Sequence, residues 1–438
     1  MTEPSTPGQP HSEPIEGGPA FATTSTVAAT WALFAGLALV MMGNGLQGSL
    51  LGVRASAEGF GLVVTGLVMA AYFAGFFAGS RYAEHALKSV GHIRVFAALA
   101  SLASSAAILH VVSVTPVTWS IMRFVFGLCM AGIYVVIESW LNDLATNETR
   151  GRILALYMIV TMGGLSGGQL LLNVGSTTGP SLFILASVLI SVSLLPITLS
   201  ASSSPPLSVP EPMGLRELIK VVPTGALTSF MNGMGVAVLM SLGAVYATRE
   251  GLSGGRLSIF ITAPIMGSWM LQWPIGWMAD HLPRRGVMLG TATACGATAI
   301  VLAFVPSDGL AALPLMFVLG GTLFPLYSLS IAYTNDRLPP EKIMGGSATL
   351  VRVNAGGAVI GPLLGAGLMS TLGSSFFFLS IAGTVAVIAV FLVYLIVVAD
   401  APSTADQDAY VAFPSRGSSA ALGLIRRRRS AQATHVDD

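Results

Sequence analysis

The sequence predicts an all-α membrane protein with twelve transmembrane helices arranged in two six-helix pseudo-repeats. Three observations predict this fold class: the composition, the number of long apolar segments and an internal repeat. Hydrophobic residues make up 53% of the chain and charged residues 9%, whereas a soluble domain carries about 25% charged residues. The 438 residues, 50 of them glycine, therefore indicate a polytopic membrane protein and exclude a large soluble core.

Apolar windows long enough to cross a bilayer, roughly 20 residues each, occur along most of the chain. An even number of spans places both tails on the same side of the membrane. The windows lie at 27–50, 61–80, 95–114, 117–141, 153–174, 179–200, 221–247, 257–279, 286–305, 311–334, 346–371 and 374–399.

The basic residues predict which side that is. If the amino end is cytoplasmic, 16 of the 21 Lys and Arg residues fall in cytoplasmic loops or tails. The outer loops then hold only Arg54, Arg249 and Arg256. Because cytoplasmic loops carry an excess of Lys and Arg, both termini are predicted to be cytoplasmic. The two remaining basic residues, Arg123 and Arg352, lie inside spans.

Five segments follow from this reading of the chain. Residues 1–25 are rich in Pro, Ser and Glu and contain no Lys or Arg, so they are not a signal peptide. The second half of the linker, residues 201–220, is predicted to form a short surface helix. Arg426 to Arg429 in the last segment either dock on anionic lipid or stay solvated. The segments are a disordered cytoplasmic tail (1–25), an amino-terminal bundle (26–200), a cytoplasmic linker (201–220), a carboxyl-terminal bundle (221–399) and a second disordered cytoplasmic tail (400–438).

The two bundles look like copies of one another. A shift of 192 residues places Glu58-Gly59 on Glu250-Gly251, and a shift of 193 aligns several residues without a gap. Two six-span repeats that face one site at the membrane midplane are a transporter architecture. The shift of 193 aligns Gly127 with Gly320, Tyr134 with Tyr327, Asn142-Asp143 with Asn335-Asp336, and Gly164 with Gly357.

Two charged residues share one face of the predicted helix 117–141. Arg123 and Glu138 are separated by about 22 Å of helical rise, and an uncompensated charge in hydrocarbon costs at least about 2.5–3.5 kcal/mol. Arg123 either binds an anionic substrate group or acts on a nearby acid during coupling; the structural alternative is that it bonds carbonyls of the first span. Glu138 either latches onto a basic inner-loop residue, the reading we favour, or carries a proton.

Several motifs resemble those of the major facilitator superfamily. GWMADHLPRR (276–285) resembles the superfamily signature G-x-x-A-D-x-x-x-R-R, and Arg123-x-x-x-Gly127 resembles the fourth-span signature associated with proton coupling. More narrowly, VGHIRVF (90–96) and TNETRGR (146–152) are similar to an orphan proteobacterial branch of twelve-span carriers. The resemblance implies a transporter of the bacterial inner membrane whose first, fourth, seventh and tenth spans line a cavity.

That implication selects polar residues of the lining spans as substrate contacts. The alternative for each amide is that it joins helices to one another in lipid. Trp269, Trp273 and Trp277 form a stripe that either stacks on a planar substrate or, as we favour, faces lipid or packs. The predicted substrate-binding residues are Asn44, Gln47, Arg123, Tyr134, Asn232 and Tyr327.

Charged residues at the inner ends of the spans are predicted to act in gating. Asp280, Arg284 and Arg285, together with Asp143 and Asp336, would form inner-side salt bridges that hold the outward-open state and break on inward opening. Arg352 lies about two turns inside the eleventh span, where a structural pairing is slightly favoured over substrate contact. Glu138 completes the predicted coupling and gating set.

The sequence therefore predicts a secondary active transporter that moves a small organic solute by alternating access, with protons as the driving ion. Efflux of amphipathic drugs and uptake of an anionic metabolite or vitamin both remain open. The rival hypothesis is a non-transporting receptor or scaffold with the same fold. No nucleophile–base pair, nucleotide loop or metal-ligand cluster appears, so no enzyme, cofactor or metal is predicted. The expected partners are the solute and membrane lipid, without nucleic acid, and the protein is expected to be a monomer.

Overall fold

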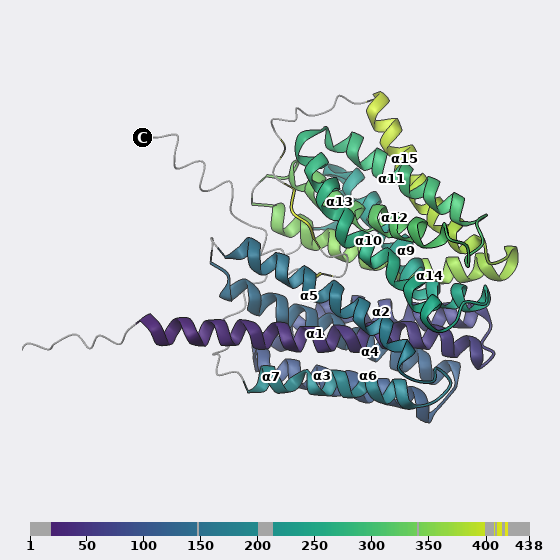
Figure 1. The fold of residues 1–438 in the computed structure, drawn as a ribbon. Coiled ribbons are helices and arrows are strands. Elements are labelled where there is room, and N and C mark those ends of the chain that lie inside the picture. Colours follow the sequence, from purple (N-terminus) through teal and green to yellow (C-terminus); the bar gives the residue numbers. More distant parts are fainter. Residues whose placement is uncertain are drawn as a thin grey trace, which may run out of the picture.

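The computed structural model of the chain describes residues 19–146, 149–199, 213–339, 341–398, 407, 410–413 and 417–418. The regular secondary structure of these residues is helical (Figure 1). The helices are α1 (Pro19–Ala57), α2 (Leu62–Val90), α3 (His92–Val112), α4 (Pro116–Leu144), α5 (Arg150–Leu170), η1 (Leu171–Asn173), α6 (Ser181–Val192), α7 (Leu194–Thr198), α8 (Leu215–Val221), α9 (Pro223–Arg249), α10 (Gly254–His281), α11 (Arg284–Leu302), α12 (Ala312–Leu323), α13 (Pro325–Asn335), α14 (Ile343–Leu372) and α15 (Phe376–Val398).

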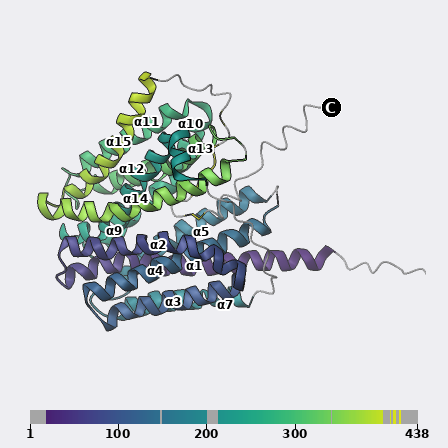
Figure 2. The same cartoon turned by 180° about the vertical axis from the view of Figure 1, so that it is seen from behind.

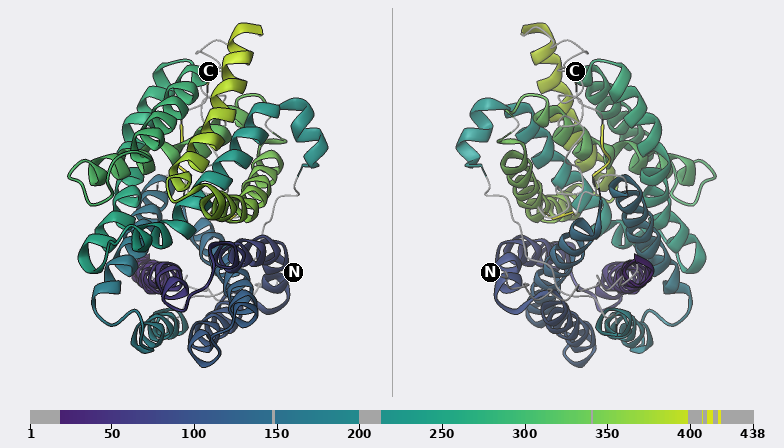
Figure 3. Two further views of the ribbon diagram at one scale, coloured as in Figure 1. Left: turned by 90° about the vertical axis from the view of Figure 1, so that its right-hand side faces the viewer. Right: turned by 90° about the vertical axis from the view of Figure 1, so that its left-hand side faces the viewer.

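The helices form two bundles. Helices α1 to α7 form the amino-terminal bundle, in which α2 packs along α4 and α1 packs along α5. Helices α9 to α15 form the carboxyl-terminal bundle, in which α9 packs along α14 and α10 packs along α12. Figures 1 and 2 show the two bundles from opposite sides, and Figure 3 shows their helices close to end-on. Helix α8 precedes α9, so the surface helix predicted in the second half of the linker is present.

The structure corrects some predicted boundaries. Helix α1 begins at Pro19, so residues 19–25 belong to a helix and not to a disordered tail. The predicted sixth span is divided into α6 and α7 and the tenth into α12 and α13. Among the described residues, eleven spans are both long and apolar enough to cross a membrane. Helix α10, with 28 residues, is long enough, but its Trp, Gln and Pro residues lower its hydropathy.

The division of the tenth span has a local cause. Pro325 has no N–H to continue the helix, and the Tyr327 N–H donates to the Phe324 carbonyl at 3.3 Å. The Leu323 carbonyl therefore loses its usual helical donor, and the Asn232 side chain of α9 donates to it at 2.7 Å. Neighbouring helices commonly satisfy such freed backbone groups inside a membrane.

The internal repeat is visible in the closest helix contacts. In each bundle a glycine lies so near a backbone carbonyl of the facing helix that any Cβ would collide with it. The repeat shifts of 192 and 193 relate these contacts to one another, and the turns at Gly59 and Gly251 both have positive φ, 74° and 82°. The matched contacts are Gly127 to Tyr72 with Gly320 to Pro264, Gly75 to Phe124 with Gly267 to Phe317, and Gly168 to Met42 with Gly361 to Met234.

At the predicted periplasmic end the bundles touch. Helix α2 meets α14 where a Cβ on Gly66 would lie 2.8 Å from the Pro362 carbonyl oxygen. Helix α1 meets α9 at Gly52, whose Cβ would lie 3.1 Å from Val245 Cγ2. These contacts close one end of the molecule, and the bundles separate toward the left of Figure 1, where α1 begins.

Candidate functional site

A cavity of about 590 Å³ opens between the bundles at the end opposite those contacts. Its amino-terminal wall is α5, through Leu154, Met158 and Met162, and its other wall is α10, including Ser268 and Gln272. At the far end of the same two helices, Thr262 Oγ1 donates to Gln169 Oε1 at 3.2 Å. Helices α5 and α10 are thus joined at one end and parted at the other.

The tryptophan stripe of α10 lies at the rim of this cavity. Trp269, Trp273 and Trp277 are 42%, 78% and 55% exposed, and all three contribute to the cavity lining. Their exposure fits the favoured prediction that the stripe faces lipid, while their position also gives the cavity an aromatic edge. The adjacent wall of α5 is aliphatic and methionine-rich, so the cavity surface is largely apolar.

Glu138 is the buried acid of the site. Its side chain on α4 has no exposed surface, and Oε1 accepts a hydrogen bond from the Tyr157 hydroxyl of α5. Its Oε2 accepts hydrogen bonds from Ser418, from the backbone N–H at 2.7 Å and from the hydroxyl. The carboxylate therefore lies where α4, α5 and the carboxyl-terminal tail meet. These contacts leave both predicted roles, latch and proton carrier, as predictions.

The carboxyl-terminal tail is itself part of the site. Residues 400–438 were predicted to be disordered, and this is wrong for the tail residues that the structure describes between the bundles. Tyr410, Val411, Ala412 and Phe413 line the cavity, and Phe413 is only 2% exposed. A run of polar and small residues predicts disorder when it cannot bury enough apolar surface alone, but here the two bundles supply the partner surface. Arg426 to Arg429 lie outside the described residues.

Arg123 is held inside the amino-terminal bundle. It is 4% exposed, its Nη1 donates to Gln47 Oε1 of α1 at 2.9 Å, and its guanidinium lies 4.6 Å from the centre of the Tyr72 ring. Met69 Sδ lies 3.9 Å from Nη2. Gly127, the glycine of the same motif, is one of the points where α2 and α4 pack too closely for a Cβ. The motif thus places a cation among α1, α2 and α4, apart from the cavity lining.

The remaining predicted substrate contacts are also buried. The Tyr134 hydroxyl contacts Met41 Sδ at 3.0 Å, within the amino-terminal bundle. Asn44 is 4% exposed, and its Nδ2 has no hydrogen-bond partner among the described residues. Asn232 supports the break in the tenth span, which favours the helix-joining alternative. Tyr327 is the one that meets the tail, because its ring centre lies 5.9 Å from that of Phe413.

The predicted gate charges are partly assembled within the carboxyl-terminal bundle. Arg284 Nη1 lies 2.5 Å from Asp336 Oδ2, and its Nη2 lies 4.0 Å from Asp280 Oδ1. Arg285 donates to the Tyr333 hydroxyl at 3.1 Å and to the Leu395 carbonyl at 3.3 Å. These contacts lie within one bundle and are present while the cavity at this end is open.

Two other charges lack such partners. Among the described residues, Asp143 makes no ion pair and lies on the exposed last turn of α4. Arg352, in the third turn of α14, is half-buried and likewise makes no hydrogen bond or ion pair with any residue the structure describes. The structural pairing slightly favoured for Arg352 is therefore not found in the described part of the chain.

Comparison with known proteins decides the family. A family model described as Major Facilitator Superfamily matches residues 33–343 and 225–432. The chain belongs to the major facilitator superfamily. It is 29% identical over 329 residues to an uncharacterized MFS-type transporter of Yersinia pseudotuberculosis, covering 73% of this chain and 83% of that protein. It is 26% identical over 361 residues to the uncharacterized MFS-type transporter YcaD of Escherichia fergusonii, covering 80% and 91%. The crystal structure of a variant of the nucleoside transporter NupG matches with a TM-score of 0.71 at 12% identity, covering 85% of this chain and 99% of that one.

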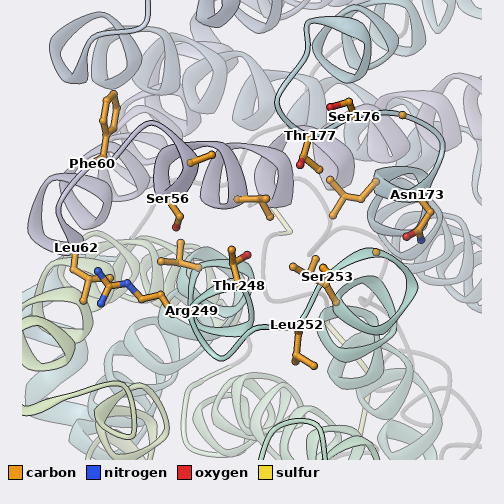
Figure 4. A pocket seen from close by; sticks show the side chains of 18 of the residues that line it. Ser56, Phe60, Leu62, Asn173, Ser176, Thr177, Thr248, Arg249, Leu252 and Ser253 are labelled. Atoms are coloured by element: carbon orange, nitrogen blue, oxygen red, sulfur yellow. The ribbon is translucent and has the colours of Figure 1, made fainter.

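As a superfamily member, this chain is a multi-pass membrane transporter, and its second cavity fits that description. A cavity of about 830 Å³ lies at the closed end of the bundles, between the α1–α2, α5–α6 and α9–α10 connections. Figure 4 shows its polar rim, with Asn173, Ser176 and Thr177 on one side and Thr248, Arg249 and Ser253 on the other. The contacts at Gly52 and Gly66 separate this vestibule from the cavity that holds the tail.

Sequence reasoning missed three side chains of this site: Gln272, which lines the open cavity, Tyr157, which binds Glu138, and Ser328, which binds Phe413 of the tail. Tyr157 and Gln272 are polar interruptions of the predicted fifth and eighth spans, and Ser328 is a small polar residue in the tenth. Tyr and Gln are rare within apolar windows, and this rarity could have identified Tyr157 and Gln272. Ser328 carried no such signal, since serine is frequent in spans and its partner, Phe413, is 85 residues away.

Proposed function

We propose that this superfamily member is a proton-coupled carrier of small organic solutes that works by alternating access. The solute path is the cavity between α5 and α10, and Glu138 is the group that takes and releases the proton. The observation that carries the proposal is Glu138 itself: a fully buried carboxylate at the meeting point of α4, α5 and the tail. The open cavity and the closed vestibule support an inward-facing conformation, with the tail end on the cytoplasmic side.

The lining favours a neutral or cationic amphipathic solute. Met158, Met162 and Trp269 offer apolar and aromatic surface, and Gln272 offers an amide. Among the described residues of the cavity lining, the charged one is acidic, Asp280, and the buried Glu138 binds Ser418 of the same tail. Opposite charges attract strongly in a wall of low dielectric constant. Because Arg123 is engaged inside the amino-terminal bundle, it does not argue for an anionic solute, and efflux of amphipathic compounds is preferred to uptake of an anion.

Coupling follows from the changing environment of the acid. In the open conformation the carboxylate is buried, but it accepts hydrogen bonds from Tyr157 and Ser418, and these donors stabilise its charged form. When α5 and α10 close on it, dehydration penalises the charged form. Closure is therefore easier when Glu138 is protonated or faces a cationic solute, and this links proton movement to solute movement. The Tyr157 hydroxyl keeps the carboxylate directed between the helices in either case.

Exchange in proteoliposomes tests the proposal after library screening by thermal stabilisation has identified a solute. Glu138→Gln keeps the size and the hydrogen bond from Tyr157 but removes the proton site. Solute counterflow at equal pH should persist within about threefold, while uptake driven by a pH gradient should fall at least tenfold. Glu250→Gln, on the exposed turn after α9, is the matched control. Gradient-driven transport that survives in Glu138→Gln would remove Glu138 from coupling, and the absence of counterflow for every stabilising ligand would favour the receptor hypothesis.

A further inference from the structure

The described tail residues bridge the two bundles. Tyr410 and Phe413 bind the carboxyl-terminal bundle, and Ser418 binds Glu138 of the amino-terminal bundle. Val411 packs against the hydrophobic core of the amino-terminal bundle. The tail therefore lies across the gap and contacts both walls of the proposed solute path.

The contacts are those of a bound ligand. Ser328 Oγ accepts a hydrogen bond from the Phe413 N–H at 2.9 Å and lies 2.9 Å from the Phe413 carbonyl oxygen, to which it donates. The Tyr410 N–H donates to Asp280 Oδ1 at 2.5 Å, and Gln272 Nε2 donates to the Tyr410 hydroxyl at 2.6 Å. The main-chain groups of Tyr410 and Phe413 thus form hydrogen bonds with side chains of α10 and α13.

Two aromatic rings complete the fit. The Phe413 ring is buried against Tyr327. The Tyr410 ring lies over Gly276, where a Cβ would come within 2.6 Å of its Cδ1 atom. A glycine at this position of α10 therefore leaves the space that the Tyr410 ring occupies. Buried aromatic anchors surrounded by satisfied polar groups are the usual core of a specific binding interface.

We propose that the described tail residues, Tyr410–Phe413 and Ser418, act as an internal competitive ligand of the solute site and thereby regulate transport. The inference rests on the proposed function of the cavity. While the segment is bound, Ser418 occupies Oε2 of Glu138, and the tail backbone lies between α5 and α10. The tail then forms one wall of the solute path and narrows it, and the bundles cannot close at this end until the tail leaves.

The covalent link between the tail and the carboxyl-terminal bundle makes this competition effective. The tail residues and the site belong to the same chain, so their binding is intramolecular, and a ligand linked in this way binds at an effective concentration of about millimolar. The solute sees only the fraction of molecules whose site is empty, and its apparent Kd rises in inverse proportion to that fraction. We therefore expect the full chain to bind solute about tenfold more weakly than a chain that lacks the segment, with little change in the maximal exchange rate.

Two variants test the regulation. One ends after residue 406, and the other keeps its length and composition but scrambles residues 407–418. Both should lower the KM for solute exchange about tenfold relative to the full chain. The scrambled variant shows whether the contacts depend on sequence, because it retains any effect of bulk or charge. A KM in the scrambled variant equal to that of the full chain would overturn the proposal.

Peptide binding tests the same site without transport. The peptide QDAYVAFPSRGS, residues 407–418, is added to the detergent-solubilised chain 1–406, and tryptophan fluorescence reports binding because Trp269, Trp273 and Trp277 line the cavity. Saturable quenching is expected, at least tenfold weaker for peptides with Tyr410→Ala or Phe413→Ala and absent for a scrambled peptide. No saturable change up to several millimolar would overturn the proposal.

The two assays separate this inference from the proposed function. Specific peptide binding by a protein that exchanges no solute would refute the carrier and leave the internal ligand standing. Solute exchange that does not change on truncation, scrambling or addition of the peptide would refute the internal ligand and leave the carrier standing.

Discussion

Replacing Gly66 with alanine should open the vestibule end of the molecule. A Cβ at Gly66 would collide with Ala366 Cβ and lie 2.8 Å from the Pro362 carbonyl oxygen. Both partners belong to α14, in the opposite bundle, so the clash exists only while the bundles touch at this end. Overpacking of this kind costs about 1–3 kcal/mol, and that difference shifts a two-state equilibrium by roughly 5- to 150-fold.

Gly367→Ala is the matched control. Gly367 lies on α14 beside Ala366, but a Cβ there has nothing within 4 Å. Both substitutions gain the same helix propensity, so only the Gly66 variant should change the conformation.

Spin labels on Ala57 and Gly255, exposed residues on opposite sides of the vestibule, would report the opening in lipid nanodiscs. Cys129 and Cys295, both buried, would be replaced first. The long-distance population should grow at least fivefold in Gly66→Ala and stay constant in Gly367→Ala. Equal distance distributions in the two variants, with Gly66→Ala folded, would refute the assignment of this contact as a gate.

Two further predictions concern stability. Asn232→Ala leaves the Leu323 carbonyl of the divided span without its side-chain donor, which should cost about 1–3 kcal/mol and lower the Tm in detergent; an unchanged Tm would mean that water or another helix fills the site. Arg284→Ala removes the guanidinium that lies 2.5 Å from the largely buried Asp336 carboxylate, and breaking a buried pair of this kind should cost about 3–5 kcal/mol. Thermal unfolding should show a smaller loss for Lys342→Ala, since the ion pair of Lys342 with Glu217 is exposed and such pairs contribute about 0–1 kcal/mol; an equal loss in both variants would contradict this ranking.

The architecture was readable from the sequence because each span must satisfy its backbone internally and present apolar side chains to lipid. The repeat was readable for a similar reason: Gly127 and Gly320 stand at matched positions where two helices pack without room for a Cβ. Asp280, Arg284, Arg285, Asp143 and Asp336 were predicted as a set of gating charges; the structure places Arg284 against Asp336, and their gating role stays a prediction.

The site was harder to predict, because helical periodicity gives the face of a residue but not the helix that covers it. Arg123 and Glu138 share one face of α4, yet α1 and α2 surround Arg123 while α5 and the tail meet Glu138. The tail illustrates the same limit. Its burial depends on Ser328 and Glu138, distant in sequence, and no local property of residues 410–418 encodes that partnership.

The central claim is that the two bundles rock as bodies, so that one end closes as the other opens. Spin labels on Tyr82 of α2 and Trp277 of α10, both exposed near the end that holds the tail, would test it in the chain 1–406. When Gly66→Ala lengthens the distance between Ala57 and Gly255, the distance between Tyr82 and Trp277 should shorten. An unchanged or lengthened distance between Tyr82 and Trp277 would contradict alternating access.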